Sequence, residues 1–211
     1  MTPDTAESET TALLREVDHR VKNNLQMIAS LIQLQARRSD DAGAQAALRA
    51  VLGRVGAVAT VHRRLFQGDP TRFEVAAFLR DLAGDLAGAA GRDDIAITLE
   101  LEPVTIAASA AAPFALVAHE LLENALRHAF PPGEGGTVRM RLSAEGSDGG
   151  ACRLVVADDG PLLDGQALAG RPDGFGLTVA RLLCRQLHAE LSLEDAGPGL
   201  RATLIVPLPD T

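Results

Sequence analysis

The chain has no tryptophan, no tyrosine and a single lysine among its 211 residues, and its formal net charge is −8 at pH 7. A nucleic-acid-binding surface needs basic residues to neutralise phosphates and aromatic rings to stack on bases. Both are scarce here, since aromatic residues make up only 3% of the chain. We therefore expect no nucleic acid among its partners.

Cysteines and long apolar runs are scarce as well. Cys152 and Cys184 stand in apolar surroundings and form no C-x-x-C pair, which predicts buried free thiols rather than a disulfide or a metal site. No apolar run approaches the roughly 18 residues of a membrane span. The first ten residues are polar and acidic, unlike a signal peptide. We expect a cytoplasmic protein without membrane insertion.

Two segments near the N-terminus, from about residue 10 to 38 and from about 44 to 67, carry apolar residues at helical spacing. A turn at 39–43, with Ser39 and the aspartates as capping candidates, joins them into an antiparallel helical hairpin over 10–68. A lone hairpin leaves apolar surface uncovered, so we expect a homodimer in which two hairpins form a four-helix bundle. The alternative is a monomer in which the second domain covers that surface.

The segment Gly68-Asp69-Pro70-Thr71 breaks the second helix, and a different pattern follows over residues 73–208. We expect helices over 75–90, 110–129 and 176–187, and strands over 95–101, 104–106, 137–143, 152–157, 190–194 and 201–207. Amphipathic helices mixed with alternating strands predict a two-layer α+β sandwich.

One histidine stands apart from the apolar side of the first helix. At about 100° per residue, His19 lies about 140° from Leu14. Five apolar residues instead gather within roughly 60° of one another and form one predicted stripe: Val17, Val21, Leu25, Ile28 and Ile32. A histidine in this position is either an ordinary solvated residue or one presented to a partner.

Residues 119–128 carry the first polar pattern of the second domain. Glu120, Asn124 and His128 recur every four residues and so share one helix face. A carboxylate, an amide and an imidazole in a row can hold a hydrated magnesium ion and phosphates. The alternative is an ordinary solvated helix face.

Two further segments lie at the end of a predicted strand and at the start of a predicted helix. Asp158-Asp159-Gly160 follows an apolar strand, where a carboxylate can accept a hydrogen bond from the amino group of a flat ring that the glycine allows to approach. Such a sequence is also typical of a simple turn. Gly174-Phe175-Gly176-Leu177 opens a helix, whose backbone N–H groups can bind phosphate.

In this order, with a histidine-bearing hairpin upstream, the segments resemble the transmitter half of bacterial sensor histidine kinases over residues 12–207. The resemblance is greatest to a subfamily related to the HWE kinases, whose phosphoacceptor box H-R-V-K-N-N-L-Q is present unchanged at residues 19–26. It implies that residues 10–68 form the dimerisation and phosphotransfer domain and residues 73–208 a GHKL-type ATP-binding domain of the Bergerat fold.

The resemblance also implies a role for each site residue. His19 would be the phosphorylated residue and catalytic, Asn124 would bind Mg²⁺, and Glu120 would hold a metal-linked water. The remaining nucleotide contacts would be Arg127 and His128 to phosphate, Asp158 to adenine, and Gly160, Gly174, Gly176 and Leu177 in the two glycine boxes that shape the pocket and its lid.

By this resemblance the protein autophosphorylates His19 from ATP and passes the phosphoryl group to an aspartate of a response regulator. Asn23, one helical turn beyond His19, would orient water for the reverse dephosphorylation. Because only about ten residues precede the first helix, we expect the signal to come from a separate sensor protein.

The first glycine box departs from the family pattern D-x-G-x-G, because it reads Asp158-Asp159-Gly160-Pro161-Leu162 and lacks the second glycine. Pro172 stands where a further glycine is often found, and the segment between the boxes leaves room only for a short lid. An alternative function is therefore a histidine phosphotransferase or phosphatase with a degenerate ATP-binding domain. A third is a binding module with a GHKL fold.

Overall fold

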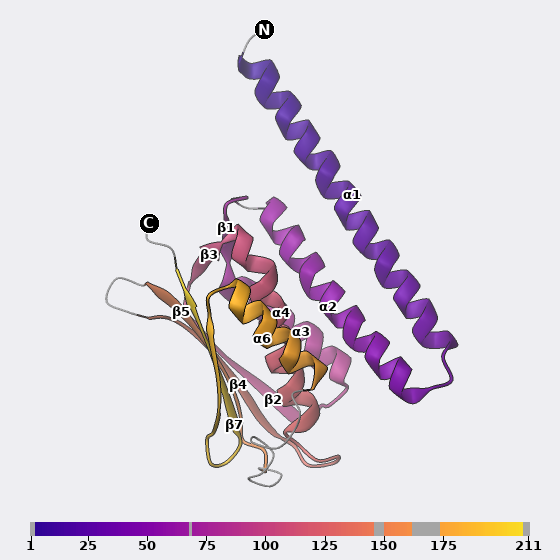
Figure 1. The fold of residues 1–211 in the computed structure, drawn as a ribbon, viewed down its shortest axis with the longest axis vertical. Helices are drawn as coiled ribbons and strands as arrows, with labels where there is room; N and C mark the ends of the chain where they lie inside the picture. The colour runs from indigo at the N-terminus through magenta and orange to yellow at the C-terminus, as the bar shows by residue number, and fades with distance from the viewer. Residues whose placement is uncertain (1–2, 68, 146–149, 162–173, 209–211) are drawn as a thin grey trace. The chain divides into compact units, whose positions relative to one another are not determined.

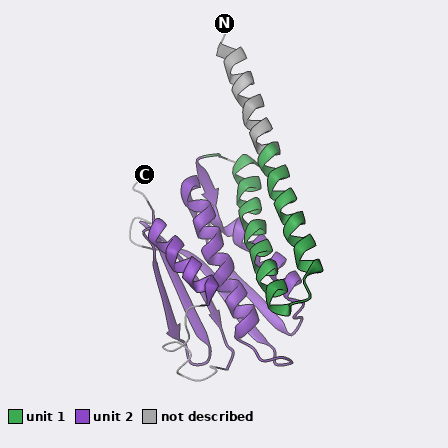
Figure 2. Ribbon diagram, turned by 45° about the vertical axis from the view of Figure 1, so that its right-hand side comes forward, with its two compact units in different colours: residues 1–70 green, residues 71–211 purple. Residues whose placement is uncertain are grey.

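The computed structural model describes residues 3–67, 69–145, 150–161 and 174–208, with side chains from Arg20 onward (Figure 1). The chain divides into two compact units, Met1–Pro70 and Thr71–Thr211 (Figure 2). The division falls inside the segment of glycine and proline that ends the helical pattern.

Unit 1 is a helical hairpin made of α1 (Pro3–Arg38) and α2 (Ala42–Gln67). Asp41 caps α2, because its Oδ1 accepts a hydrogen bond of 2.6 Å from the backbone N–H of Ala44. Ser39 Oγ in turn accepts one of 3.3 Å from the N–H of Asp41. These contacts confirm the capping residues that the sequence proposed, and they turn the chain sharply between the helices.

The described part of α1 has two apolar faces. Its less exposed residues recur every three or four positions, as expected of a face packed on α2: Val21, Leu25, Ala29, Ile32 and Ala36. Four large apolar side chains, those of Met27, Ile28, Leu31 and Leu34, are exposed instead. The prediction that Ile28 shares the packed stripe was wrong, because the turn of the helix places the small Ala29 there.

Unit 2 holds a five-stranded sheet of order β2-β4-β5-β7-β6, in which β2 runs parallel to β4 and the other neighbours are antiparallel. Its strands are β2 (Ile95–Leu101), β4 (Gly136–Glu145), β5 (Ala151–Asp158), β6 (Glu190–Asp195) and β7 (Leu200–Pro207). Two short strands, β1 (Arg72–Glu74) and β3 (Thr105–Ala107), form a separate antiparallel pair.

Three helices cover one face of this sheet: α3 (Val75–Ala90), α4 (Ala108–His128) and α6 (Phe175–Gln186) (Figure 1). Strand alternation produces the core, since β5 buries Cys152, Leu154 and Val156 on one face while the side chains between them are less buried. Unit 2 is thus the two-layer α+β sandwich expected from the sequence.

Both cysteines are free and buried, as predicted. Burial raises the pKa of the Cys152 thiol to about 12. Within the described ranges, no helix is both long and apolar enough to cross a membrane.

Candidate nucleotide-binding site

Helix α4 is the central helix of unit 2 and contacts both α3 and α6. Along its predicted site face, exposure increases toward the C-terminus: Glu120 is 2% exposed, Asn124 is partly buried and His128 is exposed. The alternative of an ordinary solvated face was therefore wrong for Glu120. Flanking helices bury the middle of α4, while its last turn reaches solvent.

Asp158 is the last residue of β5, and its side chain is largely buried. Its Oδ1 accepts two backbone hydrogen bonds of 3.2 Å each, from the N–H groups of Gly160 and Leu200. Burial raises the pKa of this carboxyl, and the two backbone donors oppose the shift. Since the described donors both use Oδ1, the carboxylate is oriented with Oδ2 left for another group.

Gly160 permits a close approach between the end of β5 and the C-terminal end of α4. A Cβ atom at this position would overlap the carbonyl oxygen of Ala129, the residue after α4. The sequence predicted that this glycine admits a ligand ring, whereas the structure shows a backbone neighbour that itself requires glycine. The predicted adenine residue is therefore held beside the predicted metal-binding helix.

The neighbouring Asp159 forms different hydrogen bonds from Asp158, a difference that the sequence did not reveal. Its Oδ1 accepts a hydrogen bond of 2.6 Å from the N–H of Thr137, and its own N–H donates to the Thr137 carbonyl. Asp159 thus connects the end of β5 to the start of β4, and only Asp158 turns into the helix-covered side of the sheet.

Helix α6 begins at Phe175, one residue earlier than predicted, with Gly174 as its N-cap. No side chain in the described ranges caps this end. The first N–H groups of a helix, here including those of Gly176 and Leu177, have no partner within the helix itself, which makes such an end suitable for an acceptor such as phosphate. Leu162, Pro172 and the rest of the expected lid at 162–173 lie outside the described residues.

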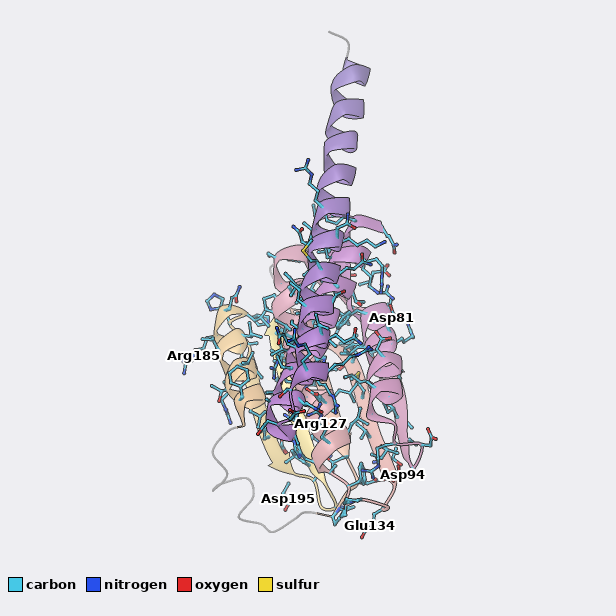
Figure 3. The ribbon with its side chains drawn as sticks, turned by 90° about the vertical axis from the view of Figure 1, so that its right-hand side faces the viewer. Asp81, Asp94, Arg127, Glu134, Arg185 and Asp195 are labelled. Carbon is cyan, nitrogen blue, oxygen red and sulfur yellow. The ribbon has the colours of Figure 1, made fainter. Side chains whose placement is uncertain are left out.

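Figure 3 shows Arg127 on the last turn of α4, toward the end of unit 2 where Asp94, Glu134 and Asp195 also lie. Arg127 is half exposed, and it forms an ion pair of 2.7 Å with Glu123 one turn earlier. The end of β5, the C-terminal end of α4 and helix α6 packed against α4 therefore form one side of unit 2.

Sequence reasoning missed two residues of α4, His119 and Glu123. His119 is 1% exposed, and its Nδ1 lies 3.5 Å from Glu120 Oε1 and 3.8 Å from Glu123 Oε2. The spacing of four residues between His119, Glu123 and Arg127 was the signal that could have found them.

In unit 1, His19 falls within α1, but its side chain lies outside the described residues. Asn23 follows one helical turn later, and its side chain is exposed.

Two family models match the chain. One, described as a histidine kinase, covers residues 16–90, and one, described as a histidine kinase-, DNA gyrase B- and HSP90-like ATPase, covers residues 110–210. The chain belongs to the histidine kinase family. The resemblance inferred from the phosphoacceptor box is confirmed, and the ATPase domain implies that this transmitter module binds ATP.

Several known proteins are similar to the transmitter module. It is 29% identical to the blue-light-activated histidine kinase 2 of Erythrobacter litoralis over 98% of its length, and 33% identical to the sensor histidine kinase PdtaS of Mycobacterium tuberculosis over 93%. It spans 60% and 40% of these relatives, respectively. The solved histidine kinase domain of an Erythrobacter litoralis blue-light activated histidine kinase superposes with a TM-score of 0.69, at 29% identity, covering 98% of this chain and 95% of that one.

Proposed function

We propose that this chain is an ATP-dependent transmitter that phosphorylates its own His19 and passes the phosphoryl group to an aspartate of a response regulator. The observation that carries the proposal is the meeting, on one side of unit 2, of an oriented buried carboxylate, Asp158, with the C-terminal half of α4. Phosphoryl transfer depends mainly on positioning and charge neutralisation, which such an arrangement can supply.

On this proposal Asp158 accepts a hydrogen bond from the adenine amino group through Oδ2. Asn124 and Glu120 hold Mg²⁺, for which their amide and carboxylate oxygens are suitable ligands, and the ion neutralises charge on the phosphates. The phosphate contacts come from Arg127, His128 and the first N–H groups of α6, with Gly160, Gly174, Gly176 and Leu177 lining the nucleotide.

His19 is the phosphoacceptor, and Asn23 orients water for dephosphorylation. The exposed apolar side chains of α1, among them Met27, Leu31 and Leu34, support a homodimer through unit 1. The cytoplasm, where ATP is available, is the location that the proposal requires.

The test is incubation of the full chain with γ-labelled ATP and Mg²⁺. We expect label on the wild type and on His188→Asn, which changes an exposed histidine outside the site, but none on His19→Ala or Asn124→Ala. Unlabelled wild type that also binds no nucleotide would overturn the proposal, and label on His19→Ala would overturn the choice of phosphoacceptor.

A second candidate function rests on the incomplete first glycine box, where Leu162 replaces the expected glycine. A phosphotransferase with a degenerate ATP domain would accept phosphate on His19 only from a phosphorylated receiver domain. Labelling by such a receiver without ATP, combined with no labelling by ATP, would favour this candidate.

A further inference from the structure

A second polar row runs along α4 beside the predicted site residues. It consists of His119, Glu123 and Arg127, each four residues from the next. His119 Nδ1 lies 3.8 Å from one carboxylate oxygen of Glu123, and the other oxygen of Glu123 forms an ion pair of 2.7 Å with Arg127. The row connects the buried middle of α4 to its exposed end.

Packing alone does not explain a histidine at position 119. The side chain is 1% exposed, and neither ring nitrogen has a hydrogen-bond partner among the described residues. A buried polar group without a partner is unfavourable compared with an apolar group of the same size.

The imidazole faces two acidic groups. Its Nδ1 lies 3.5 Å from Glu120, whose side chain is equally buried, and Glu123 is 14% exposed. Both distances exceed a normal hydrogen bond by well under 1 Å, so a small side-chain rotation brings either carboxylate onto the ring N–H.

We propose that His119 is a positioning residue of the nucleotide site: its Nδ1–H holds the carboxylates of Glu120 and Glu123, and Glu123 then holds Arg127. The inference rests on the proposed function, because Glu120 and Arg127 are two of the residues assigned there to the metal and to phosphate. Without His119, Arg127 keeps its charge but loses its fixed direction.

The experiment measures binding of Mg²⁺-ATP to the full chain by titration calorimetry, with thermal unfolding of each variant. We expect His119→Leu to weaken ATP binding about tenfold or more, as removal of a donor to a charged group does, while the variant still unfolds in one cooperative transition. His119→Asn should restore affinity to within about threefold, since its amide N–H replaces Nδ1–H. His188→Asn is the matched control and should bind as the wild type does.

A double-mutant cycle with Arg127→Ala tests whether His119 acts through Arg127. If His119 acts through Glu123 and Arg127, His119→Leu should have a clearly smaller effect on ATP affinity in the Arg127→Ala background than in the wild type. Equal effects in both backgrounds, or unchanged affinity of His119→Leu beside a wild type that binds ATP, would overturn the inference alone. A wild type that binds no nucleotide would overturn the proposed function with it.

Discussion

The Oδ1 atom of Asp158 lies 3.2 Å from the backbone nitrogen of Leu200, a residue 42 positions later in the chain. This hydrogen bond joins the end of β5 to the start of β7 and fixes the direction of the Asp158 carboxylate. The sequence predicted that Asp158 lies at the end of a strand, but not the direction of its carboxylate.

Replacing Asp158 by asparagine should separate nucleotide binding from folding. The amide oxygen can still accept hydrogen bonds from Gly160 and Leu200. The neutral amide also avoids the cost of burying a charge, which is what raises the pKa of the carboxyl. We expect Asp158→Asn to unfold at a temperature no lower than the wild type and to bind ATP about tenfold or more weakly, since the charged acceptor is lost. Unchanged affinity for ATP in a fluorescence titration would contradict the assignment of Asp158 to adenine.

Gly160→Ala should destabilise unit 2, because the new Cβ overlaps the Ala129 carbonyl. Overpacking of this kind costs about 1–3 kcal/mol, measurable as a lower free energy of unfolding in urea. Gly174→Ala is the matched control, since a Cβ there meets nothing within 4 Å. Equal free energies of unfolding for the two variants would refute the close approach.

Arg92 joins two loops at the edge of unit 2. Its guanidinium donates to both carboxylate oxygens of Asp94 and to the carbonyls of Pro131 and Glu134. The hydrogen bond from Arg92 lowers the pKa of Asp94, so this contact stabilises the fold above the ordinary carboxyl pKa and is lost as the pH falls through the lowered value. NMR titration of Arg92→Gln should show the Asp94 pKa returning toward its ordinary value. A pKa that stays low would show that another group causes the shift.

The thiols should be inert in the folded protein. Burial raises the pKa of Cys152 to about 12 and raises that of Cys184 as well, so the reactive thiolate is rare at pH 8. We expect iodoacetamide to label neither cysteine in buffer and both in denaturant. The pKa of Cys152 is higher in the folded protein than in the unfolded chain, where it is about 9. The buried thiol therefore stabilises the fold fully below about pH 9, and this stabilisation decreases as the pH rises toward 12. Rapid native labelling of Cys152 would contradict this.

The proposed homodimer should depend on the exposed apolar face of α1. Leu31→Glu places a charge on that face and should convert a dimer to a monomer, as measured by light scattering after gel filtration. Leu182→Glu, on an exposed position of α6, is the control and should leave the molecular mass unchanged. A wild type that is already monomeric would refute the dimer.

Much of the fold follows from local patterns in the sequence. The 3.6-residue and two-residue periods locate the second helix of the hairpin and the strands of the five-stranded sheet to within a few residues, since amphipathic faces form wherever a core exists. The predicted start of the first helix, about residue 10, was wrong, because α1 begins at Pro3. The same reasoning misplaced Ile28, because a helix with apolar residues on two faces does not reveal which face its neighbour covers.

By itself, the sequence determined the family, through the unbroken box at residues 19–26 and the order of the segments that follow it. Only the tertiary structure decided that Glu120 is buried, that Asp158 rather than Asp159 turns to the helix side, and that His119 faces two carboxylates. The physical reason is distance along the chain: burial and hydrogen bonding at these positions depend on α6, β4 and β7, which no local pattern around residues 119–128 or 158–160 contains.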